Sequence, residues 1–347
     1  MRQTRRNVLL GTAAVAMGSV TGCLGTSDAG SVPEDDGGTI QASFFVVSNF
    51  ADHVAADAAV RNLVPFGQHG HGWEPGPDVQ RDVFDADAFV YVGDGFQPWA
   101  DKIVQNVRND GADVNIIEAW HGVDLLDASG DHDAHGADEH DHEESPTEAH
   151  DEHDHEESPT ETHDEHDHGA KDPHFWLDPS RAKQSVRTIA NGLAERDPAN
   201  ESTYAENADA YAERLDSLDD TYAERLSGRT RDTVLVAGHN SFRYLAHRYD
   251  FHVEALTGLA PDAEPTPKDV RRAQSVVDEH DVEYVLAPVF ESDRAATQLV
   301  RETDAKEALP LTPVPTLTEE WNEKGWGYLD VMEQVNLRSL ERALGVE

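Results

Sequence analysis

Three histidines lie in loops where an imidazole could bind a metal ion. His71 sits in the Pro- and Gly-rich stretch 65–75, His174 in the stretch 172–179, and His239 directly after an apolar run. Each place is expected to be a strand-to-helix junction, where open α/β sheets bind their ligands. One such histidine alone is more often a structural or surface residue, but loops of this kind from two lobes can converge on one cleft. Three imidazoles plus water would form a tetrahedral set that suits Zn²⁺.

A second group of histidines fills residues 131–168. This stretch contains ten of the 19 histidines, 17 acidic residues and no Lys or Arg. A 13-residue unit that begins at Glu139 recurs almost unchanged from Glu152. Because the repeat has no large apolar residue it cannot bury a core, so we expect the stretch to be disordered.

Closely spaced imidazoles among carboxylates provide many loose sites for divalent transition metals. The 131–168 stretch is therefore expected to collect or sense metal without forming the tight site. The other interpretation is a solvated acidic linker that grew by duplication. The candidate weak ligands are His132, His135, His140, His142, His150, His153, His155, His163, His166 and His168.

The elements that must position the three isolated histidines follow a β–α alternation. Such alternation favours βα units and a parallel sheet. Expected strands in the first half are 42–47, 88–92 and 114–118, with an apolar-periodic segment 51–63 and helices 97–108 and 179–195. The second half continues with segments 233–237, 242–249, 252–255, 268–280, 284–287 and 294–303, and closes with a helix 329–344.

Residues 201–226 predict one long helix, because apolar side chains recur every three or four positions without Gly or Pro. The expected fold class is α/β: two βα lobes with central parallel sheets joined by this one long backbone helix. The domain prediction is a lobe at 39–200 that contains the 131–168 insertion, a linking helix at 201–230 and a lobe at 231–347. A stiff hinge and small lobe movements are expected. The alternative is a single doubly wound domain with an extra helix.

The N-terminus has the features of an export signal followed by a lipid anchor. Arg5 and Arg6 precede an apolar run, as in a twin-arginine export signal, and small residues precede Cys23, as in a lipobox. We expect residues 1–22 to be a signal peptide and the Cys23 thiol to be lipidated. Residues 23–38 would then be a flexible tether. The alternative is a plain signal peptide with a chance cysteine.

Charge and cysteine content exclude several classes of protein. The 347 residues include 27 Lys plus Arg and 69 Asp plus Glu, which gives a formal net charge of −42. Nucleic acids and anionic membrane surfaces would be repelled by this charge. One cysteine excludes an intramolecular disulfide and every multi-cysteine metal site. Only 6 of the basic residues are Lys, and a Lys-poor acidic surface suits a halophile, although an ordinary acidic protein is the alternative.

The sequence resembles the metal-binding lipoproteins of zinc and manganese ABC importers, also called cluster A-I solute-binding proteins. The resemblance runs from about residue 40 to the C-terminus, apart from the His-rich insertion. It is carried by Pro65, Gly67, His71, Trp73, Glu74 and Pro75; by the complete Asp-Pro-His-x-Trp-Leu-Asp-Pro motif at 172–179; by His239, Phe242, Tyr244 and Leu245; by Gly258, Glu264, Pro265 and Asp269; and by Tyr328, Met332, Asn336 and Leu340. The His-rich insertion is typical of zinc members, so a zinc-type member, haloarchaeal in origin, is expected.

The resemblance implies that His71, His174 and His239 are the metal ligands. Many relatives add a carboxylate from a region that aligns with 311–318, where this chain has no acid. Glu291, Glu319 or a water molecule remain candidates for the fourth position. Asp172, Asp178 and Glu74 are candidate hydrogen-bond acceptors for the rings, by proximity alone. Manganese prefers more oxygen ligands, so the missing carboxylate favours zinc.

The expected function is a lipid-anchored receptor on the outer face of the cytoplasmic membrane that captures Zn²⁺ and delivers it to an ABC permease and its ATPase. We expect a monomer, by analogy with the family. Alternatives are a manganese or other divalent-metal receptor, or an extracellular metal buffer or chaperone. A zinc hydrolase would need a general base beside the metal, and the chain lacks an HExxH motif. We therefore expect no enzymatic activity.

Overall fold

The computed structural model describes residues 38–68, 73–128, 171–259 and 265–346. All of them belong to one compact unit, Gly37–Glu347. The predictions for the signal peptide, for Cys23, for His71 and for the 131–168 stretch lie outside the described residues. Among the described residues, no helix combines the length and the apolar character needed to cross a membrane.

The first lobe has a four-stranded parallel sheet with the order β2-β1-β3-β4. Its strands are β1 Thr39–Ala42, β2 Ala59–Asn62, β3 Ala88–Tyr91 and β4 Asn115–Glu118. Its helices are α1 Phe45–Val54, α2 Pro77–Phe84, α3 Pro98–Asp110 and α4 Pro179–Arg196, with the short turns η1 Phe175–Leu177 before α4 and η2 Pro198–Asn200 after it.

The second lobe repeats the pattern in a four-stranded parallel sheet with the order β6-β5-β7-β8. Its strands are β5 Thr233–His239, β6 His252–Thr257, β7 Tyr284–Pro288 and β8 Glu307–Leu311. Its helices are α6 Arg243–Tyr249, α7 Pro267–Glu279, α8 Arg294–Glu302, α9 Glu319–Glu323, α10 Tyr328–Val331, the π-helical turn η3 Met332–Leu337 and α11 Arg338–Ala343. The predicted fold class is confirmed, and the single doubly wound domain is excluded.

Two boundaries in the first lobe differ from the sequence-based expectation. The strand expected at 42–47 ends at Ala42, and Phe45 already begins α1. The segment 51–63, expected to be one apolar-periodic unit, contains the end of α1 and all of β2. The first error has a clear cause: Phe45, Val46 and Val47 are all buried, and a short apolar run that is buried on every side has no periodicity to separate helix from strand.

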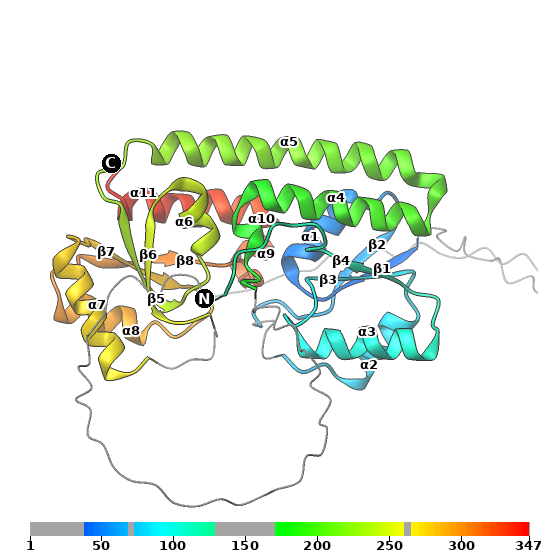
Figure 1. Cartoon of the computed structure of the whole chain (residues 1–347), viewed down its shortest axis with the longest axis horizontal. Helices are drawn as coiled ribbons and strands as arrows, with labels where there is room; N and C mark the ends of the chain where they lie inside the picture. The colour runs from blue at the N-terminus through cyan, green and yellow to red at the C-terminus, as the bar shows by residue number, and fades with distance from the viewer. Residues whose placement is uncertain (1–37, 69–72, 129–170, 260–264, 347) are drawn as a thin grey trace, which may run out of the picture. The chain divides into compact units, whose positions relative to one another are not determined.

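Helix α5, Glu201–Leu226, runs along both lobes (Figure 1). Its buried face is the one that the sequence predicted: Tyr204, Ala208, Tyr211, Leu215, Leu218, Tyr222 and Leu226. At 1.5 Å per residue the helix is roughly 40 Å long. Toward the C-lobe the Tyr222 hydroxyl donates to the Met332 carbonyl at 2.6 Å, and toward the N-lobe Asn207 donates to the Val54 carbonyl at 3.1 Å. Helix α5 is therefore hydrogen-bonded to an element of each lobe, α1 in the first and the π-helical turn η3 in the second.

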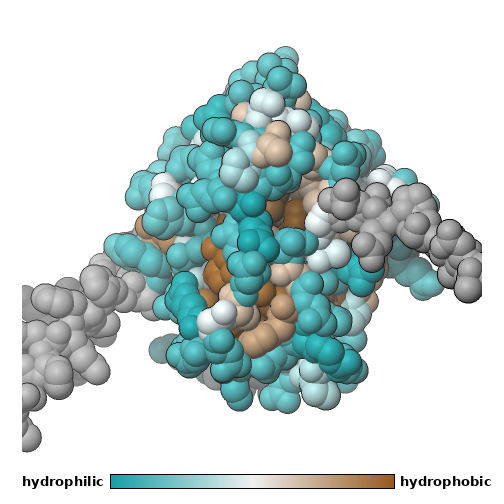
Figure 2. Space-filling model, turned by 90° about the vertical axis from the view of Figure 1, so that its right-hand side faces the viewer, coloured by the Kyte–Doolittle hydropathy of each residue, from teal (hydrophilic) through white to brown (hydrophobic). Residues whose placement is uncertain are grey.

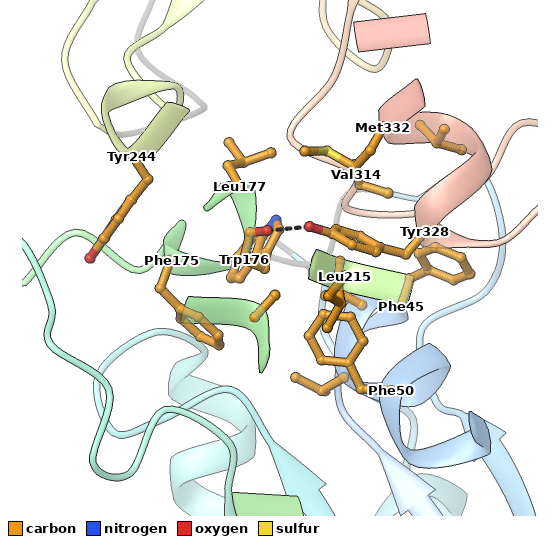
Figure 3. Packing of buried hydrophobic residues seen from close by; sticks show 14 of the residues in the cluster. Phe45, Phe50, Phe175, Trp176, Leu177, Leu215, Tyr244, Val314, Tyr328 and Met332 are labelled. Atoms are coloured by element: carbon orange, nitrogen blue, oxygen red, sulfur yellow. Dashed lines mark hydrogen bonds between the residues drawn. The ribbon is translucent and has the colours of Figure 1, made fainter. Parts of the chain in front are cut away.

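One continuous apolar core joins the lobes, and Trp176 lies in it (Figure 3). Its ring centroid is 5.2 Å from that of Phe44 and 5.8 Å from that of Phe96. The indole Nε1 donates to the Pro313 carbonyl at 2.7 Å, and the Tyr328 hydroxyl donates to the Trp176 carbonyl. Since Pro313 and Tyr328 follow β8, these bonds cross between the lobes. Figure 2 shows that the face seen there is mostly hydrophilic, with most of the apolar residues gathered near its centre.

Candidate metal centre

His174 is held by a carboxylate two residues before it. Its ring is buried at the entrance to η1. The buried Asp172 carboxylate accepts two hydrogen bonds through Oδ1, from the His174 backbone N–H at 3.0 Å and from ring Nδ1 at 2.8 Å. Because Nδ1 carries the proton in this arrangement, Nε2 is the nitrogen with a lone pair for a metal ion.

His239 has the same kind of support from a distant residue. It ends β5 and is buried. Glu291, which follows β7, accepts from ring Nδ1 at 2.5 Å through Oε1 and from the backbone N–H at 3.3 Å through Oε2. Gly238 is required here, because a Cβ at that position would lie 2.5 Å from both Glu291 Oε2 and the Pro288 ring. Nε2 is again the nitrogen available for coordination.

The two imidazoles lie together although 64 residues separate them in the sequence. Their ring centroids are 5.4 Å apart, with an interplanar angle of 47°. Two rings that bind one tetrahedral ion through Nε2 at about 2.0–2.1 Å would have centroids about 5 Å apart. The spacing therefore fits joint coordination of a single ion. Within the described ranges no three His, Cys, Asp or Glu side chains form a complete metal site, and His71, the third predicted ligand, lies outside them.

The loop that carries His71 can be followed at its start. Gly67, with a φ of 79°, donates its N–H to Thr316 Oγ1 at 3.0 Å. Thr316 belongs to the 311–318 segment, so this N-lobe loop is tied to the C-lobe. That segment also forms the Trp176–Pro313 hydrogen bond. It thus contacts two of the three predicted ligand loops.

The candidates for the fourth metal ligand differ in where their side chains lie. Glu291 uses both oxygens on His239, which places it behind the ring as an outer acceptor. Glu319 is exposed at the start of α9. In the 311–318 segment Val314 has a φ of 56°, a conformation that is strained for a β-branched residue, and it contributes only an apolar side chain. Among the described residues, none of these candidates presents a carboxylate to the two imidazole Nε2 atoms.

Of the three acceptors suggested by proximity, Asp172 holds the ring of His174, and neither of the other two holds a described histidine. Asp178 caps α4 instead, because it accepts from Ser180 N–H at 2.8 Å and pairs with Arg181. Glu74 is exposed. The pairing of Glu291 with His239 was not predicted, although Glu291 was named as a possible ligand. Nothing in the local sequence links two residues that are 52 positions apart.

Burial lowers the pKa of His174, against the opposing effect of the Asp172 hydrogen bond. The ring is therefore neutral at pH 7, as coordination requires. The shift also predicts a pH effect on the metal-free protein. Below the ordinary histidine value of about 6.5, the unfolded chain binds a proton that folded His174 refuses, so the free energy of unfolding falls as pH falls toward the folded-state pKa.

Urea unfolding of the metal-free protein between about pH 7 and pH 5 tests this expectation, since one such group contributes a slope of at most about 1.4 kcal/mol per pH unit. The matched variant His174→Gln keeps a polar side chain of similar size but does not titrate. It should lose that part of the slope. Identical slopes in both proteins would contradict a buried, neutral His174.

The His-rich insertion leaves and rejoins the fold beside His174. The described residues that flank it meet in an antiparallel bridge between Asp127 and Lys171, with Lys171 Nζ 2.5 Å from Asp127 Oδ1. The Asp172 N–H donates to the Leu126 carbonyl at 2.9 Å. We call residues 126–127 and 171–172 the neck. The neck ends at the carboxylate that holds a predicted metal ligand.

Comparison with known proteins gives one consistent result. Residues 40–343 match the family model of ZnuA, described as zinc-uptake complex component A, periplasmic. The chain is 32% identical over 313 residues to the zinc-binding lipoprotein AdcA of Streptococcus pneumoniae R6, covering 89% of this chain and 56% of AdcA. It is 30% identical over 306 residues to the high-affinity zinc uptake system protein ZnuA of Bacillus subtilis, covering 88% and 87%.

Solved structures agree with these matches. Zn(II)-bound AdcA of S. pneumoniae superposes with a TM-score of 0.69 at 30% identity, covering 89% of this chain and 58% of that one. The metal-dependent lipoprotein YcdH of B. subtilis superposes with a TM-score of 0.68 at 26% identity, covering 88% and 98%. The chain thus spans little more than half the length of AdcA.

Proposed function

Because the chain belongs to the family of ZnuA, the periplasmic component A of zinc-uptake complexes, we propose that it is the extracytoplasmic zinc receptor of an ABC importer. It binds Zn²⁺ between its lobes through His71, His174 and His239 and delivers the ion to the permease, which its ATPase drives. The observation that carries this proposal is the pair of buried imidazoles 5.4 Å apart, each backed by a carboxylate. Zinc is the bound cargo, and the protein is a receptor without enzymatic activity.

Zinc is preferred to manganese because of the donor set. Glu291 and Asp172 both act on ring nitrogens, and the 311–318 segment has no carboxylate to offer. Three imidazole nitrogens and a water suit Zn²⁺, whereas Mn²⁺ favours carboxylate and water oxygens. A manganese receptor would need a carboxylate in the inner sphere.

The His-rich insertion is proposed to hold weak, accessory zinc beside the tight site. Competitive zinc titration of the mature protein tests both parts together. The intact protein should bind one tight equivalent and several weak ones, and deletion of 131–168 should remove the weak equivalents alone. Loss of the tight equivalent on deletion would contradict the accessory role. Absence of a tight equivalent in the intact protein would contradict the receptor itself.

The N-terminus is proposed to be a twin-arginine signal followed by lipidated Cys23, which anchors a monomeric receptor to the outer face of the cytoplasmic membrane. Support comes from the motifs themselves and from relatives named as lipoproteins. Mass spectrometry of the mature protein should find a diacylglyceryl group on residue 23 and no residues before it.

A halophilic, haloarchaeal origin is proposed from the charge on the surface. Along α5 exposed acids follow one another every three or four residues, at Glu206, Asp209, Glu213, Asp216, Asp220 and Glu224. Each like-charge pair at this spacing costs about 0.2–0.5 kcal/mol. The Debye length falls from about 10 Å at 0.1 M salt to about 3 Å at 1 M, which screens these pairs.

The free energy of unfolding should therefore rise by about 1–2 kcal/mol or more between about 0.1 M and 1 M KCl. Urea unfolding at both salt concentrations measures the change. A Glu213→Gln, Asp220→Asn double variant should show a smaller rise, because it interrupts the acidic row twice. A salt response that is flat in the wild type would contradict the halophilic interpretation.

A further inference from the structure

Arg243 is the first residue of α6 in the second lobe, the C-lobe. It reaches the segment 172–179 of the first lobe, the N-lobe, which carries His174. Its side chain is 12% exposed. Nη1 lies 3.6 Å from Oδ2 of the fully buried Asp172 and donates to the Asp127 carbonyl at 2.6 Å. The Arg243 guanidinium thus contacts both segments of the neck. It contacts 126–127 through the Asp127 carbonyl and 171–172 through the Asp172 carboxylate, which holds His174.

The next residue, Tyr244, forms hydrogen bonds with the backbone of the same two segments. The Tyr244 hydroxyl accepts from the Leu126 N–H at 2.9 Å and donates to the Asp172 carbonyl at 2.7 Å. The backbone of Asp172 is therefore fixed by Tyr244, and its side chain faces Arg243. Of these contacts made by α6, the one from Arg243 acts on a carboxylate oxygen of Asp172, and those from Tyr244 act on the backbone.

We propose that Arg243 is a positioning residue of the metal site, which fixes the Asp172 carboxylate and through it the ring of His174. The inference rests on the proposed zinc function for its effect on affinity. Asp172 Oδ1 receives both bonds from His174. Oδ2 accepts no hydrogen bond from the described residues, and the Arg243 guanidinium, 3.6 Å away, attracts it by charge and so favours this rotation of the carboxylate. Both contacts come from Nη1, and the rigid, planar guanidinium fixes the position of that nitrogen better than a flexible stem fixes an ammonium.

The same arrangement links the two ligands. His239 ends β5, and Arg243 begins the helix that follows it, four residues later. A displacement of the β5–α6 turn would move His239 directly. It would also move Arg243, and with it the Asp172 carboxylate that supports His174. The orientation of His174 in the N-lobe thus depends on the position of the turn that presents His239.

A role as a simple positive charge makes the opposite prediction. A cation beside a metal site repels the metal, so removing it would tighten zinc binding, most strongly at low salt. Loss of positioning weakens binding at all salt concentrations, because the ring leaves its coordinating orientation. Partners of ligands commonly contribute 10–100-fold to metal affinity. The sign of the effect therefore separates the two roles.

The test compares Arg243→Gln and Arg243→Lys with Arg248→Gln, a matched change on α6 that removes the pair with Asp219 and a 3.9 Å contact with Asp178, the cap of α4. Zinc affinity is measured by competition at low salt and at about 1 M KCl, where screening is short-ranged. Arg243→Gln should weaken binding about tenfold at both, Arg243→Lys less, and Arg248→Gln should leave it unchanged. Unchanged or tighter binding in Arg243→Gln, or an equal loss in Arg248→Gln, would overturn the proposal.

A second readout needs no metal. Nitrogen NMR of the imidazoles in the metal-free protein reports which ring nitrogen of His174 carries the proton. The wild type and Arg243→Lys should show the Nδ1–H form, and Arg243→Gln a mixture of both forms. If the intact protein lacked a tight zinc equivalent but this mixture appeared, the receptor function would fail while the positioning role stood. An unchanged His174 signal in Arg243→Gln would refute the positioning role.

Discussion

Replacing either of the two predicted ligands that the structure describes, as His174→Ala or His239→Ala, is expected to weaken zinc binding by about 100- to 1000-fold. Structural zinc sites with four ligands bind with about 10–16 kcal/mol, so one ligand contributes roughly 3–4 kcal/mol, and 1.4 kcal/mol is a tenfold change. Both rings are buried and backed by a carboxylate. Neither can therefore be replaced by a neighbouring histidine without rearrangement.

Competitive titration against a zinc chelator of known affinity measures the change. His247→Ala is the matched control, because His247 is exposed on α6, which follows the turn after His239. Its affinity should equal that of the wild type. If His174→Ala kept the wild-type affinity, His174 would be a buried structural residue, and the metal centre proposed between the lobes would be wrong.

The continuity of the core limits how the ion can leave. Trp176, Tyr328 and Pro313 connect the lobes by buried contacts close to His174, and α5 supports both sheets. Opening the lobes widely would break this core. Release through movement of the ligand loops costs less, since loops carry fewer buried contacts. The stiff hinge stays a prediction.

The sequence located α5 and most elements of the second lobe, but it missed β8 and α9 and misplaced the start of the first lobe. Along α5 each buried position recurs every three or four residues, so periodicity alone identifies the buried face. In α1 the residues Phe45 to Val47 are all buried, and the pattern that separates helix from strand is lost. Tertiary packing decided that boundary.

The candidate site could be predicted only as far as its local motifs extend. Asp172 and His174 belong to one short motif, so their pairing was expected from proximity. Glu291 reaches His239 because β7 lies beside β5 in the sheet, and Arg243 reaches Asp172 because the lobes pack together. These contacts depend on strand order and lobe packing, which no local spacing contains.

The largest expected loss of stability follows from Trp176→Ala. Trp176 is completely buried and packs against Phe44 and Phe96, and truncating a buried Trp to Ala costs about 3–5 kcal/mol. The change also removes the donor to the Pro313 carbonyl. Urea unfolding in high salt should show this loss, accompanied by weaker zinc binding, because residue 176 follows His174 by two positions.

Two further variants separate the causes. Trp176→Phe keeps an aromatic ring but leaves the Pro313 carbonyl without its donor, so it should cost about 1–3 kcal/mol. Trp326→Ala removes an indole that is only half-buried, stacked on Trp321 in the C-lobe, and should affect stability less and zinc affinity not at all. Equal losses of zinc affinity in Trp326→Ala and Trp176→Ala would mean that global destabilisation, and not the cross-lobe contact beside His174, controls the metal centre.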